Sequence, residues 1–98
     1  MSLSPNQKRH LRGLGHHLKP VVIIGQHGLR DSVMAEIELA LDSHELIKVK
    51  IVADRDLRLQ LGDEIVARTG ADTVNRIGQM QVLFRRNTKQ PKVALPSN

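Results

Sequence analysis

The chain lacks several residues and segments on which whole classes of protein depend. It contains no cysteine, so neither disulfide bonds nor a thiolate zinc site can hold its fold. No apolar run approaches the roughly 18 residues that a membrane helix requires. The N-terminal residues also lack the apolar stretch of a signal peptide. We therefore expect a cytoplasmic protein without a membrane partner.

Aromatic side chains are almost absent as well. Phe84 is the only one, and the chain has no tryptophan or tyrosine. Nucleic-acid modules that stack bases on exposed rings, such as the RRM, cold-shock and many OB-fold surfaces, need several such rings. These modules are excluded, so a nucleic-acid ligand would have to be held by its sugar–phosphate backbone.

The charged residues are separated into blocks by sign, and the net charge is +5. Residues 1–30 contain five basic and no acidic residues, whereas residues 31–45 contain five acidic and no basic ones. Residues 46–72 are balanced, and residues 73–98 again hold five basic residues and no acid. This pattern indicates a basic face and an acidic face, and it favours a nucleic-acid ligand over a basic protein without one.

The hydrophobic pattern predicts one domain over residues 1–98 with the element order α-β-α-β-α-β-β. Helices are expected over residues 5–18 and 30–43 and around Leu57, Leu61 and Ile65, and strands over 21–24, 46–52, 73–77 and 80–86. The first strand is wholly apolar, which is typical of a strand buried on both faces. Parallel crossovers place the second and third helices on one face of a four-stranded mixed sheet, so the fold class is a two-layer α/β domain. The tail from about Gln90 is expected to be loosely held.

The first helix combines a start signal with two distinct faces. Ser4 and Gln7 form an S-x-x-Q capping box around Pro5. Leucines at helical spacing form an apolar stripe, namely Leu11, Leu14 and Leu18. Roughly opposite that stripe lies a basic arc of Lys8, Arg9, Arg12 and His16.

The stretch Gly25-Gln26-His27-Gly28 lies between the first strand and the second helix. At the N-terminus of a helix, unpaired amides and the helix dipole attract phosphate. The glycines would let a sugar–phosphate chain come close, and Arg30 adds a positive charge beside them. The alternative is that the glycines serve only a tight turn. Neither a P-loop nor a dinucleotide fingerprint is present, because the required lysine and glycine spacings are missing.

No residue pattern indicates catalysis, a metal or a cofactor. His10, His16 and His17 share one helix but lack the spacing and the carboxylate of a zinc site. The consecutive residues Ser43, His44 and Glu45 cannot form a catalytic triad with one another. We therefore expect a protein that is not an enzyme and uses no cofactor.

Several motifs together resemble the YhbY-like members of the CRM-domain family, whose name stands for chloroplast RNA splicing and ribosome maturation. The resemblance covers roughly residues 3–95. Its distinctive parts are Leu18-Lys19-Pro20, Gly25-x-x-Gly28-Leu29, Leu46-Ile47-Lys48-Val49 and Thr69-Gly70.

This resemblance implies a fold like the C-terminal domain of translation initiation factor 3 and RNA binding without catalysis. It also implies that the partner is ribosomal RNA in precursors of the large ribosomal subunit. We expect the chain to be a monomer. The residues expected to contact RNA are the loop residues Gly25, Gln26, His27 and Gly28 and the basic residues Lys8, Arg9, Arg12, Lys19, Arg30, Arg85 and Arg86. Two alternatives stay open, namely an architectural protein that coats duplex DNA and a protein–protein adaptor that uses the acidic second helix.

Overall fold

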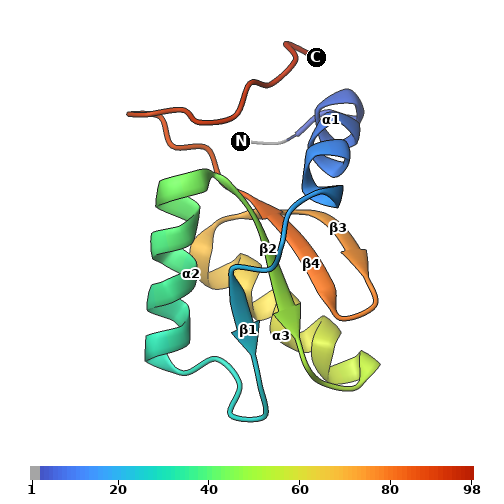
Figure 1. The fold of residues 1–98 in the computed structure, drawn as a ribbon, viewed down its shortest axis with the longest axis vertical. Coiled ribbons are helices and arrows are strands. Elements are labelled where there is room, and N and C mark those ends of the chain that lie inside the picture. Colours follow the sequence, from blue (N-terminus) through green and yellow to red (C-terminus); the bar gives the residue numbers. More distant parts are fainter. Residues whose placement is uncertain (1–2) are drawn as a thin grey trace.

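The order of helices and strands in the computed structural model, which describes residues 3–98, is the predicted one (Figure 1). The elements are α1 (Pro5–His16), β1 (Val22–Ile24), α2 (Asp31–His44), β2 (Leu46–Ile51), α3 (Arg55–Thr69), β3 (Asp72–Ile77) and β4 (Met80–Phe84). The strands form one sheet in the order β1-β2-β4-β3. β1 is parallel to β2, whereas β4 is antiparallel to both of its neighbours. The predicted four-stranded mixed sheet is therefore confirmed.

The two faces of the sheet have separate hydrophobic cores. α2 and α3 cover one face, where Ile37, Leu41 and Ile65 belong to the same buried cluster as Ile47 and Val49 of β2. A smaller cluster on the other face joins residues of α1, the sheet and the tail, with Leu11, Leu46, Val74, Val82 and Phe84 at its centre. α1 thus lies on the face opposite to α2 and α3, and it contacts β2 and β3.

The prediction that the first strand is buried on both faces is wrong. Val22 and Ile24 are buried against the main core, but the side chain of Ile23 is 61% exposed and that of Val21 is 51% exposed. The reason is topological, because β1 is an edge strand and α1 covers the sheet beside it instead. An apolar run of four residues cannot reveal which of its two faces another element will cover.

The start of α1 agrees with the predicted capping box, but its packing face differs from the predicted stripe. The backbone N–H of Gln7 donates to Oγ of Ser4 at 3.1 Å, and the N–H of Ser4 donates to Oε1 of Gln7 at 3.0 Å. Leu11 is fully buried, whereas Leu14 is 42% exposed. Gly15 is buried instead, because the helix lies so close to β4 that a Cβ there would come within 2.9 Å of Cγ1 of Val82.

The hairpin between β3 and β4 turns at Gly78 and Gln79, the two residues left between the strands predicted over 73–77 and 80–86. Gly78 has a φ of +56°, and Gln79 is not among the described residues with positive φ. A two-residue loop whose first residue alone has positive φ is typical of a type II′ turn. The turn brings the carbonyl of Gln79 beside the end of β2, where it accepts a hydrogen bond from the N–H of Ile51 at 2.8 Å.

The sequence predicts a loosely held tail from about Gln90. In the structure this tail lies against α1 (Figure 1). Nε2 of Gln7 donates to the carbonyl of Pro96 at 2.9 Å, and Nε2 of His10 lies 2.9 Å from the carbonyl O of Ala94. Val93 and Leu95 pack against the smaller core. The physical reason is that α1 and the sheet leave an apolar surface that the tail covers in part.

Candidate nucleic-acid interface

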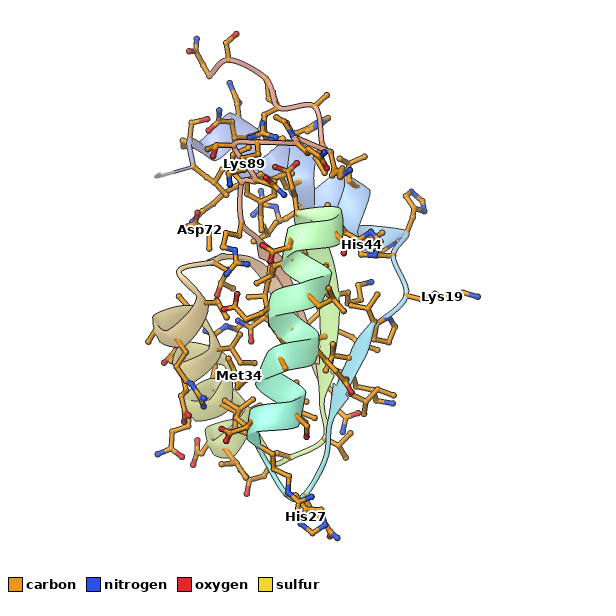
Figure 2. The ribbon with its side chains drawn as sticks, turned by 90° about the vertical axis from the view of Figure 1, so that its left-hand side faces the viewer. Lys19, His27, Met34, His44, Asp72 and Lys89 are labelled. Carbon is orange, nitrogen blue, oxygen red and sulfur yellow. The ribbon has the colours of Figure 1, made fainter. Side chains whose placement is uncertain are left out.

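The Gly25–Gly28 loop lies at the end of the molecule, where β1 stops (Figures 1 and 2). The N–H of Gly28 donates to the carbonyl of Gly25 at 3.0 Å, which closes the turn. Gly28 has a φ of +69°, a conformation that side chains disfavour. Gly25 differs, because its φ is not positive and a Cβ built there would meet nothing within 4 Å. The turn therefore requires a glycine at position 28 but not at position 25.

The α2 helix that follows this loop begins without a side-chain cap. Arg30 occupies the N-cap position, and its side chain makes no capping hydrogen bond. The first amides of α2 therefore lack the acceptor that Ser4 supplies in α1 and Asp54 supplies in α3. Asp31 lies in the first turn of α2 and favours the helix dipole, but it does not cap these amides.

The basic residues of α1 are exposed, and so is Lys19 in the connection to β1. Within the part of the chain that the structure describes, no ion pair involves Lys8, Arg9, Arg12 or Lys19. Figure 2 shows the side chain of Lys19 extending away from the molecule, on the side where β1 runs. These four cations are therefore available to an anionic ligand.

Two further lysines lie on the sheet face that α1 shares. Lys48 and Lys50 of β2 are half-buried and alternate with Ile47, Val49 and Ile51, which point into the main core. Lys50 is opposite the exposed Ile23 of β1 in the strand register. Both lysines lie within the strand predicted over residues 46–52, but neither was among the predicted site residues. The sequence does not reveal that α1 leaves the β1 edge of this sheet face uncovered.

Arg85 lies away from this basic surface, in contact with the acidic face of α2. Its guanidinium donates to Oε2 of Glu38 at 2.7 Å, to Oδ1 of Asp42 at 2.9 Å and to the carbonyl of Thr69 at 2.9 Å. The side chain of Arg85 is 22% exposed. The acidic residues of α2 thus neutralise an arginine that the sequence assigned to RNA.

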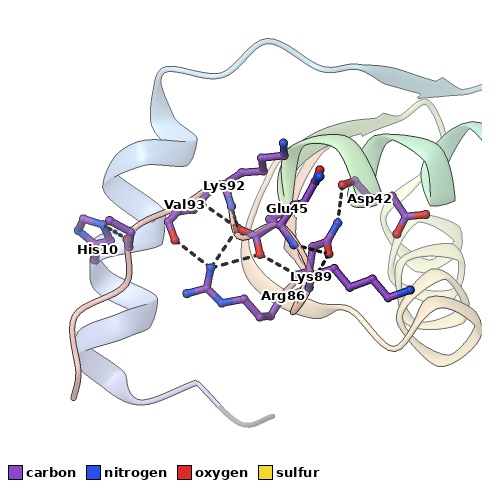
Figure 3. Close-up of polar contacts among 10 residues, drawn as sticks. His10, Asp42, Glu45, Arg86, Lys89, Lys92 and Val93 are labelled. Atoms are coloured by element: carbon purple, nitrogen blue, oxygen red, sulfur yellow. Dashed lines mark hydrogen bonds and ion pairs between the residues drawn. The ribbon is translucent and has the colours of Figure 1, made fainter.

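Arg86 is bound to a buried carboxylate (Figure 3). Nη1 of Arg86 donates to Oε1 of Glu45 at 3.0 Å and to the carbonyl of Val93 at 2.9 Å. The Glu45 carboxylate also accepts hydrogen bonds from the backbone N–H groups of Asn87, Lys92 and Val93, at 2.6, 2.6 and 2.8 Å. Arg86 therefore helps to hold the tail in place through its Nη1 group.

The pKa of the Glu45 carboxyl is lowered from its ordinary value. Burial acts in the opposite direction and would raise the pKa, because it disfavours the charged form. The backbone hydrogen bonds from Asn87, Lys92 and Val93, followed by that from Arg86, outweigh burial. Glu45 is therefore an ionised group inside the protein at neutral pH.

The predicted site residues fall into three groups. The Gly25–Gly28 loop and the start of α2, where Arg30 is the N-cap, lie at one end of the longest axis, and α1 lies at the other (Figure 1). The molecule extends 39 Å along this axis. Arg85 and Arg86 form the third group, which is paired with acids. Lys48 and Lys50, which were not among the predicted residues, lie on the sheet face between the two ends.

Two other features, a metal site and a membrane-spanning helix, are absent from residues 3–98. No cluster of histidine and carboxylate side chains there has the arrangement to hold a metal ion. No helix in the same range has the length and apolar character needed to cross a membrane.

A family model places this chain in a known class of protein. The model of the CRS1 / YhbY (CRM) domain matches residues 3–85 of the chain. The chain belongs to the CRS1/YhbY (CRM) domain family, which confirms the resemblance noted in its motifs. The family is non-catalytic, which agrees with the expectation that the chain is not an enzyme.

Similar proteins come from several bacteria. A Haemophilus influenzae protein named "RNA-binding protein" is 48% identical over 96 residues, which cover 97% of this chain and 96% of that protein. A Pseudomonas aeruginosa protein named "Probable RNA-binding protein" is 47% identical over 93 residues, or 94% of this chain and 89% of its own. A Staphylococcus aureus protein with a solution structure is 31% identical in sequence to this chain. The two structures match with a TM-score of 0.83, and the match covers 97% of this chain and all of that one.

Proposed function

We propose that the chain binds structured RNA through the sugar–phosphate backbone and acts without catalysis in the assembly of the large ribosomal subunit. The names of its relatives from Haemophilus influenzae and Pseudomonas aeruginosa support RNA as the ligand. The resemblance to YhbY-like proteins supports ribosomal RNA in large-subunit precursors as the particular RNA.

The observation that carries this proposal is the glycine at position 25. Neither backbone conformation nor crowding requires a glycine there, whereas the positive φ of Gly28 does require one. A residue without a side chain at an exposed position, in the loop that leads to the uncapped start of α2, allows a phosphate to reach the backbone. The loop and Arg30 thus form one end of the proposed interface.

The rest of the interface follows from the positions of the available cations. Lys8, Arg9, Arg12 and Lys19 provide contacts at the α1 end, and the face between the two ends adds Lys48 and Lys50. An RNA that contacts both ends has to cross the open part of this sheet face. Arg85 and Arg86 are left out of the interface, because carboxylates already hold their guanidinium groups.

The adaptor alternative loses its main support in the structure. It relied on a free acidic face of α2, but Glu38 and Asp42 pair with Arg85. The duplex-DNA alternative relies on the same cations as the RNA proposal, so an experiment has to separate the two.

Competition binding provides that experiment. The protein, bound to a labelled fragment of large-subunit ribosomal RNA, is challenged with unlabelled ribosomal RNA, duplex DNA or heparin at equal charge concentration. We expect ribosomal RNA to compete at the lowest concentration. Stronger competition by duplex DNA would favour an architectural DNA-binding protein, and equal competition by all three would contradict specific RNA binding. Co-sedimentation of the tagged protein with large-subunit precursors, and not with mature subunits, then tests the assembly role.

A further inference from the structure

A groove of about 530 Å³ lies between α1 and the uncovered β1 edge of the sheet. Leu14 and Leu18 line it from the end of α1, and Val21 and Leu46 line it from the sheet side. Val93 of the tail closes one side, where the hydrogen bonds to Glu45 hold it. The groove is therefore built by segments that are far apart in the sequence.

The ionisable side chains of this groove carry no negative charge. Lys19, Lys48 and His44 are the ionisable residues among those that line it, and no aspartate or glutamate joins them. Figure 2 shows Lys19 and His44 on the same side of the molecule, near the junction of α1 with the sheet. An apolar floor with two ammonium groups at its sides fits a ligand that is flat and apolar in the middle and anionic at its edges.

A nucleotide has this chemistry. A base that is out of its stack can lie between apolar side chains, and histidine is one of the residues on which bases stack. The phosphates on either side of such a nucleotide would then be within the field of the two lysines. The apolar surface of the base would cover Leu14 and Val21, which are 42% and 51% exposed without it.

We propose that this groove receives the base of one unpaired nucleotide in the bound RNA, with Lys19 and Lys48 contacting its flanking phosphates. This inference rests on the proposed RNA-binding function and makes it more specific. The groove adjoins Lys19 and the basic arc of α1, so it continues the proposed interface. The chain would thereby prefer RNA with a bulged or looped-out nucleotide, although it has no exposed phenylalanine, tyrosine or tryptophan on which to stack one.

Three RNA hairpins of one stem sequence test the proposal. The first has a single bulged adenosine, the second has an abasic nucleotide at the bulge, and the third is fully paired. We expect the wild-type protein to bind the adenosine bulge about five to ten times more tightly than the abasic bulge, since one stacked base contributes at about this level. The abasic RNA keeps the phosphates and the kink, so the ratio isolates the base.

Two matched variants test whether the groove causes this ratio of affinities for the adenosine and abasic bulges. Leu14→Asn places an amide in the groove, and Leu39→Asn makes the same change on α2, where the side chain is 68% exposed beside the acidic residues. The ratio should fall close to 1 in the Leu14→Asn protein and stay at the wild-type value in the Leu39→Asn protein. If Leu14→Asn does not fold, Val21→Thr alters the groove with almost no change of shape and should lower the ratio too.

The outcomes for the groove and for RNA binding are distinct. Equal wild-type affinity for the adenosine and abasic bulges would overturn the groove proposal and leave RNA binding intact, and so would an unchanged ratio in both groove variants. Binding of all three hairpins no tighter than heparin would count against the proposed function itself. Occupation of the groove by a second copy of the chain would appear as a dimer in sedimentation that Leu14→Asn dissociates, and it too would overturn the proposal.

Discussion

The carboxylate of Glu45 and the guanidinium of Arg86 form an ion pair at 3.0 Å in which the glutamate is fully buried. The pair joins the acidic residues 31–45 to the basic residues 73–98, and Arg85 repeats this connection through Glu38 and Asp42. Much of the C-terminal positive charge is therefore cancelled inside the fold. The positive field that remains for a nucleic acid comes mainly from residues 1–30 and from the sheet.

The first prediction concerns the stability that Glu45 provides. Glu45→Gln keeps the size of the side chain but removes its charge, and it directs an N–H group toward donors. The glutamine keeps one carbonyl oxygen, so with that oxygen at the Oε1 position the N–H of Asn87 would lose its acceptor, and Arg86 would lose its ion-pair partner. We expect the free energy of unfolding to fall by about 3 kcal/mol, as for other broken buried pairs.

Urea denaturation followed by circular dichroism measures this loss. Glu36→Gln is the matched control, because Glu36 is exposed on α2 and should change stability by no more than about 0.5 kcal/mol. Equal unfolding free energies for the two variants would mean that the Glu45 carboxylate is not a source of stability.

The second prediction is the pH dependence of the same contact. The folded-state pKa of Glu45 is lowered, so its contribution is fully present above the unfolded pKa of about 4.3 and is lost as the pH falls through the lower folded value. The stability difference between wild type and Glu45→Gln should be constant at neutral pH and shrink below about pH 4. The protection factors for hydrogen exchange at the amides of Lys92 and Val93, which correct for the intrinsic pH dependence of exchange, should fall over the same pH range. A difference that grows on acidification would contradict the lowered pKa.

The third prediction separates the arginines that are paired from those that are free. The affinity for RNA should fall with salt, and each phosphate contact removed should reduce the log–log slope by about 1. Arg12→Ala should reduce the slope in this way, because Arg12 is exposed and has no ion-pair partner in the described residues. Arg85→Ala should leave the slope unchanged and lower stability instead. A reduced slope for Arg85→Ala in a normally folded protein would return that arginine to the interface.

The residues that sequence reasoning placed correctly are those with local signals. The capping box at Ser4 and the turn at Gly78 depend on neighbours within a few positions, so their chemistry is visible in the sequence. The role of Glu45 depends on partners more than 40 positions away, and no local pattern announces it. The exposure of Ile23 depends on where α1 crosses the sheet, which apolar periodicity does not determine. The charge blocks predict two faces, but they could not show that residues of opposite blocks pair with each other.

The fourth prediction uses two glycines of α1 that the fold treats differently. A Cβ added at Gly13 would meet nothing within 4 Å. Because alanine has a higher helix propensity than glycine, Gly13→Ala should raise the free energy of unfolding by about 1 kcal/mol. Gly15→Ala places a methyl group 2.9 Å from Cγ1 of the buried Val82. The helix must then move away from β4, and the free energy of unfolding should fall by about 1 to 3 kcal/mol. Thermal melting of the two variants compares them directly, and a gain in both would show that α1 does not pack as closely as the structure has it.

The last prediction concerns what the Gly25–Gly28 loop presents to a ligand. A glycine substitution is uninformative at position 28, because the positive φ of that residue would be strained and the turn itself would be damaged. The double change Gln26→Glu with His27→Glu leaves both glycines in place and alters only exposed side chains. Two carboxylates beside the uncapped start of α2 would repel phosphate and also favour the helix dipole. We therefore expect a melting temperature close to that of the wild type and RNA affinity lowered by at least about tenfold.

The neutral double variant Gln26→Ser with His27→Ser is the control for this experiment. It removes the same two side chains without adding charge, and it should keep most of the affinity if backbone amides make the contact. Loss of binding in both variants would instead assign the contact to the Gln26 and His27 side chains. Full binding by the glutamate variant at normal stability would mean that the glycines serve only the turn. RNA would then be held by α1 and the sheet lysines alone, and Arg12→Ala and Lys48→Ala should have the larger effects on affinity.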